Sequence, residues 1–293
     1  MKMEKFVPFH INAESDDFKG NGNNGRYVLL PGSEGRAEKI AAMWQDVTVR
    51  KHPRNHNLYM GKMNTESGDI DMAVISTGMG TPSADIIINE LINLGARNLI
   101  RIGTSGSMQP EYVPEGSIVV PTGSVKDETT TSRYLPAEMP AVPSMEFLTA
   151  AHMAKDGLLV DAVHNSKAEA DKRGLARVYP NQVFFGIVHS KDSLYAREML
   201  VGPKRRENEE YMRLLKEGGV LASEMETSIL FTLGQIYSHQ NIKNGKPPIA
   251  TGAVLAVIGG FTPFGDKDTE TSAINAAISY CFKTVEVLNL SRF

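Results

Sequence analysis

Three arginines, a threonine and a set of glycines are the residues of this 293-residue chain best suited to hold an oxyanion such as phosphate. Arg101 stands inside an apolar run at 98–102 that is typical of a buried strand, where a guanidinium is costly to bury without an anionic partner. The run is followed by Gly103, Thr104, Ser105 and Gly106. We expect a glycine-rich turn here that exposes backbone N–H groups to a bound anion. The residues alone also allow a second interpretation, in which Arg101 pairs with a carboxylate and the glycines only form the turn.

Two other arginines stand where they could reach the same anion. Gly32 follows a predicted strand, and Arg36 falls in the first turn of a helix predicted at 34–45. A cation at a helix N-terminus opposes the helix dipole, so we expect Arg36 to be there to bind an anion. The alternative interpretation is that Arg36 is simply exposed to solvent. Arg54 belongs to a basic cluster at 50–56 of the kind usually found on a solvated edge or hairpin.

The run Glu224-Met225-Glu226 places a methionine between two carboxylates. One carboxylate accepts two hydroxyl hydrogen bonds at once, which suits the vicinal diol of a ribose, and methionine can pack on the face of a sugar. Taken alone, an acidic helix N-terminus is the simpler interpretation, because the helix dipole favours carboxylates there.

Composition and missing motifs exclude several functions. A net charge of −3, from 31 Lys and Arg against 34 Asp and Glu, argues against a nucleic-acid partner. Cys281 is the single cysteine, and His10, His52 and His56 lack ligand spacing, so neither a disulfide framework nor a metal site is expected. The glycines form neither a Walker loop nor a dinucleotide fingerprint, and no Gly-x-Ser-x-Gly nucleophile elbow is present. Because the sequence contains no signal-peptide pattern and no apolar run of membrane-spanning length, we expect a cytoplasmic protein that acts on a small molecule and does not bind a membrane.

The elements that position these residues alternate between strands and helices. Strands are predicted at 27–31, 71–77, 98–102, 117–120, 183–188, 220–223 and 250–258. Helices are predicted at 34–45, 81–94, 144–156, 204–217, 226–239 and from 268, with a long loop at 121–143 and a surface excursion at 161–179. This order predicts a three-layer α/β fold with a mostly parallel or mixed central sheet flanked by helices, in which ligands bind at the carboxyl ends of strands. We expect one domain at 26–293, preceded by a polar arm at 1–25.

Four motifs resemble, in order and spacing, those of the hexamer-type nucleoside phosphorylases, and among these most of all the uridine phosphorylases. The motifs are Pro31-Gly-Ser-Glu-Gly-Arg36, Ser76-Thr-Gly-Met-Gly80, Arg101-Ile-Gly-Thr-Ser-Gly106 and Glu224-Met-Glu226. Two shorter runs, Phe9-His10 and Met139-Pro-Ala-Val142, are similar to further motifs of that family. The resemblance covers about residues 9–290, with extra length at 161–179 and 240–248.

This resemblance implies a pentosyltransferase of nucleoside catabolism and salvage, which converts a nucleoside and phosphate into the free base and ribose 1-phosphate. It implies phosphate binding by Gly32, Arg36, Arg54, Arg101 and Thr104, and ribose binding by His10, Met225, Glu226 and Glu224. Arg101, Thr104 and Glu226 would be catalytic, positioning phosphate against an oxocarbenium-like transition state without a covalent intermediate or a cofactor. Arg54 and His10 would come from a neighbouring subunit, so the N-terminal arm serves that subunit's site. A shared site requires at least a homodimer, and a hexamer built as a trimer of dimers is the larger assembly implied.

The sequence departs from the family at the base site. Uridine phosphorylases carry a Phe-Tyr-x-Gly-Gln-x-Arg segment whose glutamine and arginine pair with uracil, whereas this chain has Ser193-Leu-Tyr-Ala-Arg-Glu-Met199. Glu198 stands at the glutamine position, Arg197 is a candidate substitute for the arginine, and Phe261 occupies the place of a second arginine. The residues assigned to the base site are Ser105, Gly106, Leu194, Tyr195, Arg197, Glu198 and Phe261.

Four functions therefore stay open. Phosphorolysis of uridine or a relative comes first, and a purine nucleoside phosphorylase follows if Asp192 or Asp266 reaches the base. A hydrolytic nucleosidase of the same fold does not need the three arginines. A non-catalytic nucleoside-binding protein has little reason to keep a phosphate site opposite a ribose site.

Overall fold

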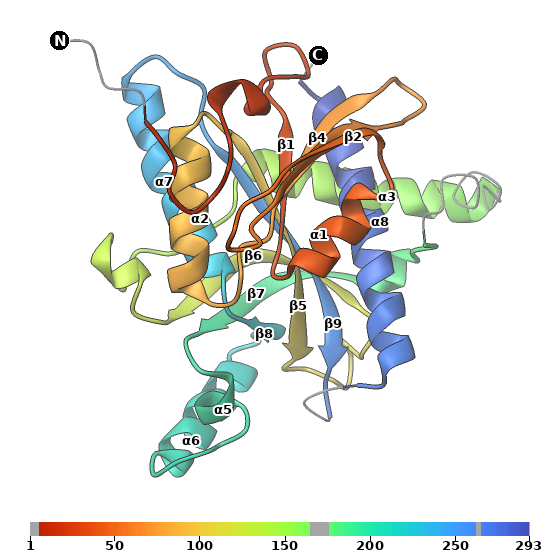
Figure 1. The fold of residues 1–293 in the computed structure, drawn as a ribbon. Coiled ribbons are helices and arrows are strands. Elements are labelled where there is room, and N and C mark those ends of the chain that lie inside the picture. The colour runs from red at the N-terminus through yellow and green to blue at the C-terminus, as the bar shows by residue number, and fades with distance from the viewer. Residues whose placement is uncertain (1–5, 165–175, 262–264, 293) are drawn as a thin grey trace.

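The computed structural model describes residues 6–164, 176–261 and 265–292, and it contains a nine-stranded sheet with helices on both faces (Figure 1). The strands are β1 (Tyr27–Pro31), β2 (Gln45–Arg50), β3 (Leu58–Met63), β4 (Ile70–Val74), β5 (Asn98–Ser107), β6 (Ile118–Asp127), β7 (Val183–Lys191), β8 (Ala222–Glu224) and β9 (Ala250–Gly259). The α-helices are α1 (Glu34–Ala41), α2 (Thr81–Asn93), α3 (Met145–His164), α5 (Leu194–Arg197), α6 (Arg205–Glu217), α7 (Thr227–Lys243) and α8 (Lys267–Leu290). Three short 3-10 helices are η1 (Ser15–Phe18), η2 (Thr131–Arg133) and η3 (Pro180–Gln182). The predicted α/β class with a mixed central sheet is confirmed.

One part of the sheet has a free edge, and the other part closes on itself. Its strand order is β2-β3-β4-β1-β5-β8-β7-β6-β9, and β9 pairs in addition with β5. The strands β5, β8, β7, β6 and β9 therefore form a closed ring. The sheet is mixed, because β1 is parallel to β4 and β5 while β8 runs antiparallel to β5 and β9 antiparallel to β6.

Two hydrophobic cores occupy the two faces of the sheet, because successive side chains of a strand point to opposite sides. On β1, Tyr27 and Leu29 belong to the core under α1, α3 and α8. Val28 and Leu30 of the same strand belong to the core under α2 and α7. Figure 1 shows these two groups of helices on opposite sides of the sheet, which is the predicted three-layer arrangement.

The predicted turn after 102 is wrong, because β5 continues through the glycines to Ser107. Gly103 pairs with Leu255 of β9 instead of turning. A Cβ at position 103 would lie 2.7 Å from Leu255 Cδ2 and 2.9 Å from Arg101 Nε. Gly103 is thus the residue that leaves room for the Arg101 side chain on the same face of the strand.

Other element boundaries also differ from the prediction. β6 extends to Asp127, so the first part of the expected loop at 121–143 is strand, and β7 extends to Lys191. The helix expected at 34–45 ends at Ala41. Most of the expected excursion at 161–179 lies outside the described residues. In the part of the chain that is described, no helix has the length and apolarity needed to cross a membrane.

The described part of the N-terminal arm is attached to α2 of the same chain by one carboxylate. Glu90 accepts hydrogen bonds from the backbone N–H groups of Phe9, His10 and Ile11, at 2.9–3.1 Å. Its Oε1 also lies 2.7 Å from His10 Nδ1. Glu90 therefore fixes where this end of the arm sits.

Candidate active site

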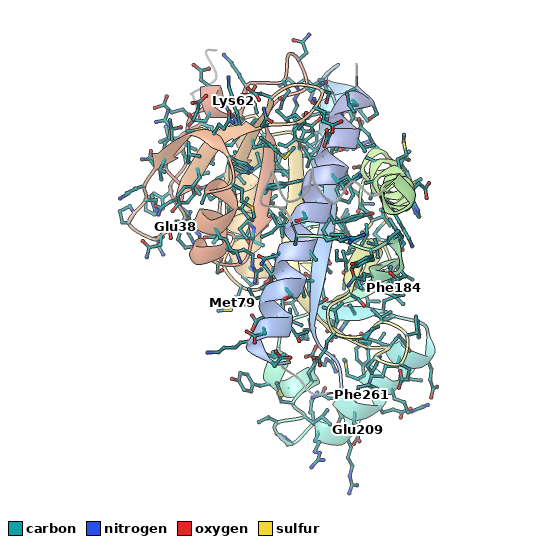
Figure 2. The ribbon with its side chains drawn as sticks, turned by 90° about the vertical axis from the view of Figure 1, so that its right-hand side faces the viewer. Glu38, Lys62, Met79, Phe184, Glu209 and Phe261 are labelled. Atoms are coloured by element: carbon teal, nitrogen blue, oxygen red, sulfur yellow. The ribbon has the colours of Figure 1, made fainter. Side chains whose placement is uncertain are left out.

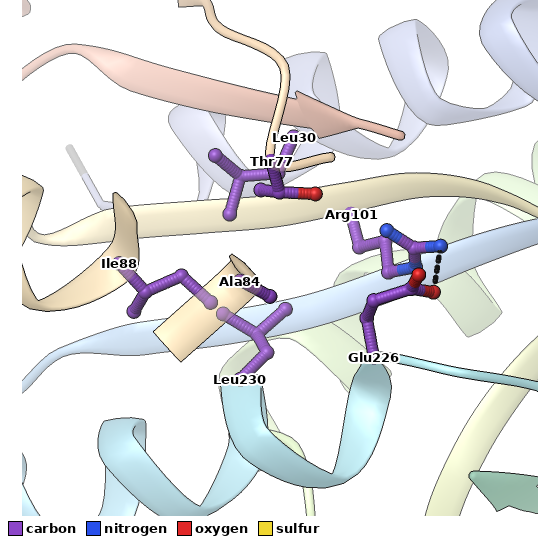
Figure 3. Close-up of a pocket in the computed structure, with 7 residues that line it drawn as sticks. All are labelled: Leu30, Thr77, Ala84, Ile88, Arg101, Glu226 and Leu230. Atoms are coloured by element: carbon purple, nitrogen blue, oxygen red, sulfur yellow. Dashed lines mark hydrogen bonds and ion pairs between the residues drawn. The ribbon is translucent and has the colours of Figure 1, made fainter. Parts of the chain in front are cut away.

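An ion pair between Arg101 and Glu226 joins two elements that are distant in the sequence. Arg101 is on β5, and Glu226 is the N-cap of α7. The Nη2 of Arg101 donates a hydrogen bond to Glu226 Oε2. The other oxygen, Glu226 Oε1, accepts the backbone N–H of Gly80 at the start of α2, 2.6 Å away. Leu30 and Leu230 line the small pocket on the apolar side of the pair (Figure 3). One carboxylate therefore connects β5, α2 and α7.

Arg101 is buried and keeps an unused donor. Arg101 is 5% exposed, and its Nη1 has no hydrogen-bond partner among the described residues. Its Nε lies 3.4 Å from Glu224 Oε2. Arg101 thus pairs with two carboxylates, as one of the two interpretations of the sequence expects. The remaining N–H groups leave the other interpretation, an anion site, available as well, since a buried unpaired donor is unfavourable until it finds an acceptor.

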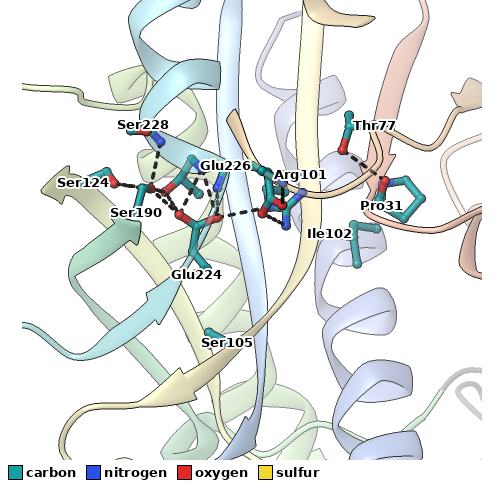
Figure 4. A network of polar contacts seen from close by, with 12 residues as sticks. Pro31, Thr77, Arg101, Ile102, Ser105, Ser124, Ser190, Glu224, Glu226 and Ser228 are labelled. Carbon is teal, nitrogen blue, oxygen red and sulfur yellow. Dashed lines mark hydrogen bonds and ion pairs between the residues drawn. The ribbon is translucent and has the colours of Figure 1, made fainter. Parts of the chain in front are cut away.

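Arg36 brings a second positive charge close to Arg101. Its Nη1 donates to the backbone carbonyl of Ile102, the residue after Arg101 on β5, at 3.4 Å (Figure 4 labels Ile102). Burial, and next the charge of Arg101, lower the pKa of Arg36 to about 10. An anion held between the two guanidinium groups would relieve their repulsion.

Glu224 caps α7 and is fully enclosed. Its oxygens accept the backbone N–H of Glu226 at 2.8 Å and of Thr227 at 3.0 Å, and they also accept the hydroxyls of Thr227 and Ser190 (Figure 4). Burial raises the pKa of Glu224, but the charge of Arg101 and these hydroxyl hydrogen bonds outweigh it, so the net pKa lies below the usual value. The acidic-helix-start interpretation therefore describes Glu224 well.

Glu226 differs from Glu224 in its environment. Burial raises the pKa of Glu226, and the neighbouring Glu224 charge adds to that rise against the lowering by Arg101. Its described hydrogen bonds are those from Arg101 and Gly80, which leaves lone pairs for further donors. Glu226 is the carboxylate of the pair that can accept sugar hydroxyls.

The remaining residues predicted to bind phosphate and ribose fall into two groups. Thr104 is half-buried on β5, Gly32 lies between β1 and α1, and Met225 lies between the two glutamates. Arg54 is exposed in the turn between β2 and β3, and His10 is bonded to Glu90. The described contacts do not bring Arg54 or His10 to Arg101 within one chain.

Of the residues predicted for the base site, Arg197 already has other partners. Its Nε and Nη2 each lie 2.6 Å from Asp127, its Nη1 donates to Asn208 at 2.7 Å, and its guanidinium stacks 4.2 Å from the ring centre of Tyr211. These contacts hold α5 and α6 against β6, so Arg197 is not free to replace the family arginine.

The two carboxylates considered for a purine also have other partners. Asp192 is exposed and accepts the backbone N–H of Thr129 at 3.2 Å. Asp266 is the N-cap of α8 and accepts from the N–H groups of Asp268 and Thr269 at 3.0 Å. Each therefore has a structural role in the described chain.

The other residues predicted for the base site lie on β5, on α5 and after β9. Ser105 is buried on β5, and Gly106 pairs with Ser223 of β8. Leu194 is half-buried and Tyr195 exposed, both on α5. Phe261 is exposed at the end of the molecule where α6 also lies (Figure 2 labels Phe261 and Glu209).

Lys191 is the site residue that sequence reasoning missed. It is buried on β7, and its Nζ lies 2.7 Å from Glu198 Oε1 and 2.9 Å from Ser223 Oγ. Two residues earlier on the same face, His189 connects the same Ser223 hydroxyl to Asp127, at 3.0 and 2.8 Å. The alternation of His189 and Lys191 would have pointed to this face only if the strand had been extended beyond 188. No group of His, Cys, Asp or Glu in the described chain is arranged to hold a metal ion.

Comparisons with known proteins agree on one group. The sequence profile of the Phosphorylase superfamily matches residues 26–242. A uridine phosphorylase of Treponema pallidum (strain Nichols) is 32% identical over 284 residues, which are 96% of this chain and 93% of that protein. A guanosine phosphorylase of Halorubrum lacusprofundi is 29% identical over 208 residues, 71% of each chain. A crystal structure of uridine phosphorylase from Vibrio fischeri ES114 has the same fold, with a TM-score of 0.65 and 23% identity over 89% of this chain and 91% of that one.

Proposed function

The chain belongs to the Phosphorylase superfamily, and we propose that it is a nucleoside phosphorylase with uridine as its first candidate substrate. It takes a nucleoside and inorganic phosphate and releases the free base and ribose 1-phosphate. The observation that carries this proposal is the buried, partly unpaired Arg101 beside the diol acceptor Glu226. Guanosine is the second candidate, because a guanosine phosphorylase is among the relatives.

In the proposed reaction, phosphate lies between Arg101 and Arg36, near the backbone at Gly32 and the hydroxyl of Thr104. Its oxygen forms a bond to the anomeric carbon as the glycosidic C–N bond breaks, and that electron pair leaves with the base. The base takes up one proton, and hydrogen phosphate gives one up as it becomes the ribose 1-phosphate dianion. Phosphate must compete with Glu226 for the Arg101 N–H groups, which frees the carboxylate to accept the two ribose hydroxyls. The protein contributes position and charge, and it forms no covalent bond to the sugar.

The unit that performs the reaction is proposed to be a homodimer or a larger assembly of dimers in the cytoplasm. Arg54 and His10 are not brought to Arg101 in one chain, which fits a role for both in the site of a neighbouring subunit. No cofactor is required, because phosphate is the second substrate.

The test is base release from uridine, thymidine, inosine, guanosine and adenosine, each with and without phosphate. We expect phosphate-dependent release of the base from uridine or guanosine. Release that does not need phosphate would indicate a nucleosidase. No release from any of the five would contradict the proposal.

Replacing the phosphate ligand tests the assignment of the site. Arg101→Ala should lower kcat/KM roughly a hundredfold or more, since it removes a buried charge that acts on the nucleophile. Because this variant also leaves Glu226 unpaired, Arg36→Ala should be measured beside it, with circular dichroism for both. Arg213→Ala on the exposed face of α6 is the matched control and should keep full activity. A fully active Arg101→Ala enzyme would refute the phosphate site.

A further inference from the structure

We propose that Glu198, held by the buried Lys191, selects bases that carry a ring N–H beside a carbonyl, such as uracil and guanine, and rejects cytosine and adenine. This inference rests on the proposed function for its substrate class. It departs from the glutamine and arginine expected at this place, because this chain has neither of them available.

The first step is that the ion pair is built into the protein. Lys191 is 2% exposed, and its ammonium forms an ion pair with Glu198 Oε1 at 2.7 Å. It also donates hydrogen bonds to Ser223 Oγ at 2.9 Å and to the Glu224 carbonyl at 3.4 Å. The lysine side chain is 3% exposed and that of Glu198 19% exposed. The lysine therefore forms the inner end of the pair, and the carboxylate is its accessible end.

The second step is that the pair stands beside the phosphate and ribose residues. Glu198 Oε2 lies 3.9 Å from where a Cβ on Gly106 would be, so the carboxylate faces the end of the strand that carries Arg101. Lys191 contacts the backbone of Glu224, two residues before Glu226. Its charge is near enough to lower the pKa of Glu226. A nucleoside whose sugar is held at Glu226 therefore has Glu198 within reach of its base.

The third step is the chemistry of the free oxygen. No residue in the described chain donates a hydrogen bond to Glu198 Oε2, although Oε1 is held by Lys191. An ionised carboxylate only accepts hydrogen bonds, whereas a glutamine amide can turn to present either a donor or an acceptor. Uracil N3–H and guanine N1–H can donate to it. Cytosine N3 and adenine N1 would direct a lone pair at it.

Lys191 is a positioning residue in this scheme. Its ammonium forms an ion pair with Glu198 Oε1 at 2.7 Å and so holds the carboxylate in one position. It also offsets the negative charge of Glu198, which would otherwise oppose the charge that the departing base gathers. The Ser223 hydroxyl and the Glu224 carbonyl fix its direction.

The deciding variant is Glu198→Gln, with Glu210→Gln on the exposed face of α6 as the matched control. We would measure kcat/KM for uridine, guanosine, cytidine and adenosine with phosphate, and the dissociation constants of the same nucleosides by calorimetry. The wild-type enzyme should favour the two oxo nucleosides, and Glu198→Gln should reduce that preference about tenfold or more, mainly by admitting cytidine and adenosine. The control should keep the wild-type preference. An unchanged preference in Glu198→Gln would overturn the inference.

Two further measurements separate this inference from its premise and from a merely structural role. If the wild-type protein binds nucleosides with the stated preference and Glu198→Gln loses it, the inference holds even if no base is released and the proposed function fails. Lys191→Met removes the ion-pair partner of Glu198, so the carboxylate is no longer held in place and the preference should decline in the folded variant. The double variant Lys191→Met with Glu198→Gln should show no further loss of preference beyond that of Glu198→Gln alone, because the two residues act as one unit. An unchanged preference in folded Lys191→Met would contradict the role given to Lys191.

Discussion

At the scale of single residues, Arg101 fits on β5 because Gly103, on the same face of the strand, has no side chain. Strand β5 carries Gly103 two residues after Arg101, on the same face, and the guanidinium fills the space that a Cβ would need. Glycine in a strand is otherwise unfavourable because it has no side chain to pack and more backbone entropy to lose. The position of Arg101 thus depends on the space that Gly103 leaves, and not on a hydrogen bond from that residue.

Gly103→Ala tests this dependence. We expect it to displace Arg101, to raise KM for phosphate, and to lower stability by about 1–3 kcal/mol through overpacking. Gly123→Ala on β6 is the matched control, because its nearest neighbours lie 3.6 and 3.8 Å from the new Cβ, an ordinary contact distance. Phosphate titrations and thermal unfolding of both variants would decide the matter. Equal phosphate KM in the two would show that Gly103 does not position Arg101.

At the scale of elements, helices α2 and α7 begin at the site and each is tied to it by a carboxylate. Glu226 accepts the N–H of Gly80 at the start of α2, and Glu224 accepts the first N–H groups of α7. A third carboxylate, Glu90, lies in the last turn of α2 and holds the N-terminal arm. The three carboxylates thus fix the start of α2, the start of α7 and the described part of the N-terminal arm, none of which is held by strand pairing.

The arm should leave α2 in acid. Burial raises the pKa of Glu90, but the hydrogen bonds from His10 and Phe9 outweigh it, so its pKa lies below the usual 4.5. Its stabilisation of the docked arm is therefore complete above that value and is lost as the pH falls through the lowered pKa of the folded state. The protection of residues 6–13 against hydrogen exchange, corrected for the intrinsic exchange rate at each pH, should decline as the pH falls below about 4.5, the usual pKa of a glutamate. Glu90→Gln should show fast exchange already at pH 7, and slow exchange in that variant would argue against the attachment.

At the scale of the whole molecule, the sequence predicts the alternation of layers but not the extent of the strands. The helix at 81–93 is specified locally by its N-terminal proline and its apolar residues, and the prediction of 81–94 matches it to within one residue. Strands β5, β6 and β7 are longer than expected because their second halves are set by pairing with partners far along the chain. Lys191 escaped prediction for the same reason, since burial of a lysine depends on a carboxylate seven positions later and on β8. Arg101 was found because an arginine in an apolar strand is anomalous in the sequence itself.

The assembly makes a prediction at this scale. If Arg54 serves the neighbouring site, mixing inactive Arg101→Ala subunits with inactive Arg54→Ala subunits under exchange should restore activity. In a dimer, one intact site then forms in half of the molecules, which gives about a quarter of the wild-type rate. Mixing Arg101→Ala with Arg36→Ala is the control and should restore nothing, because both residues act in their own chain. No recovery in the first mixture would place Arg54 outside the partner's site.

The closed ring of β5, β8, β7, β6 and β9 has a mechanical consequence. Arg101 sits on β5 and Lys191 on β7, and neither strand can slide unless all five shift together. In the proposed site, the distance between the phosphate end and the base end would therefore be fixed by the sheet. Admission of substrate and departure of product fall to segments outside the ring, of which α5 and α6 project furthest from the body of the molecule (Figure 1).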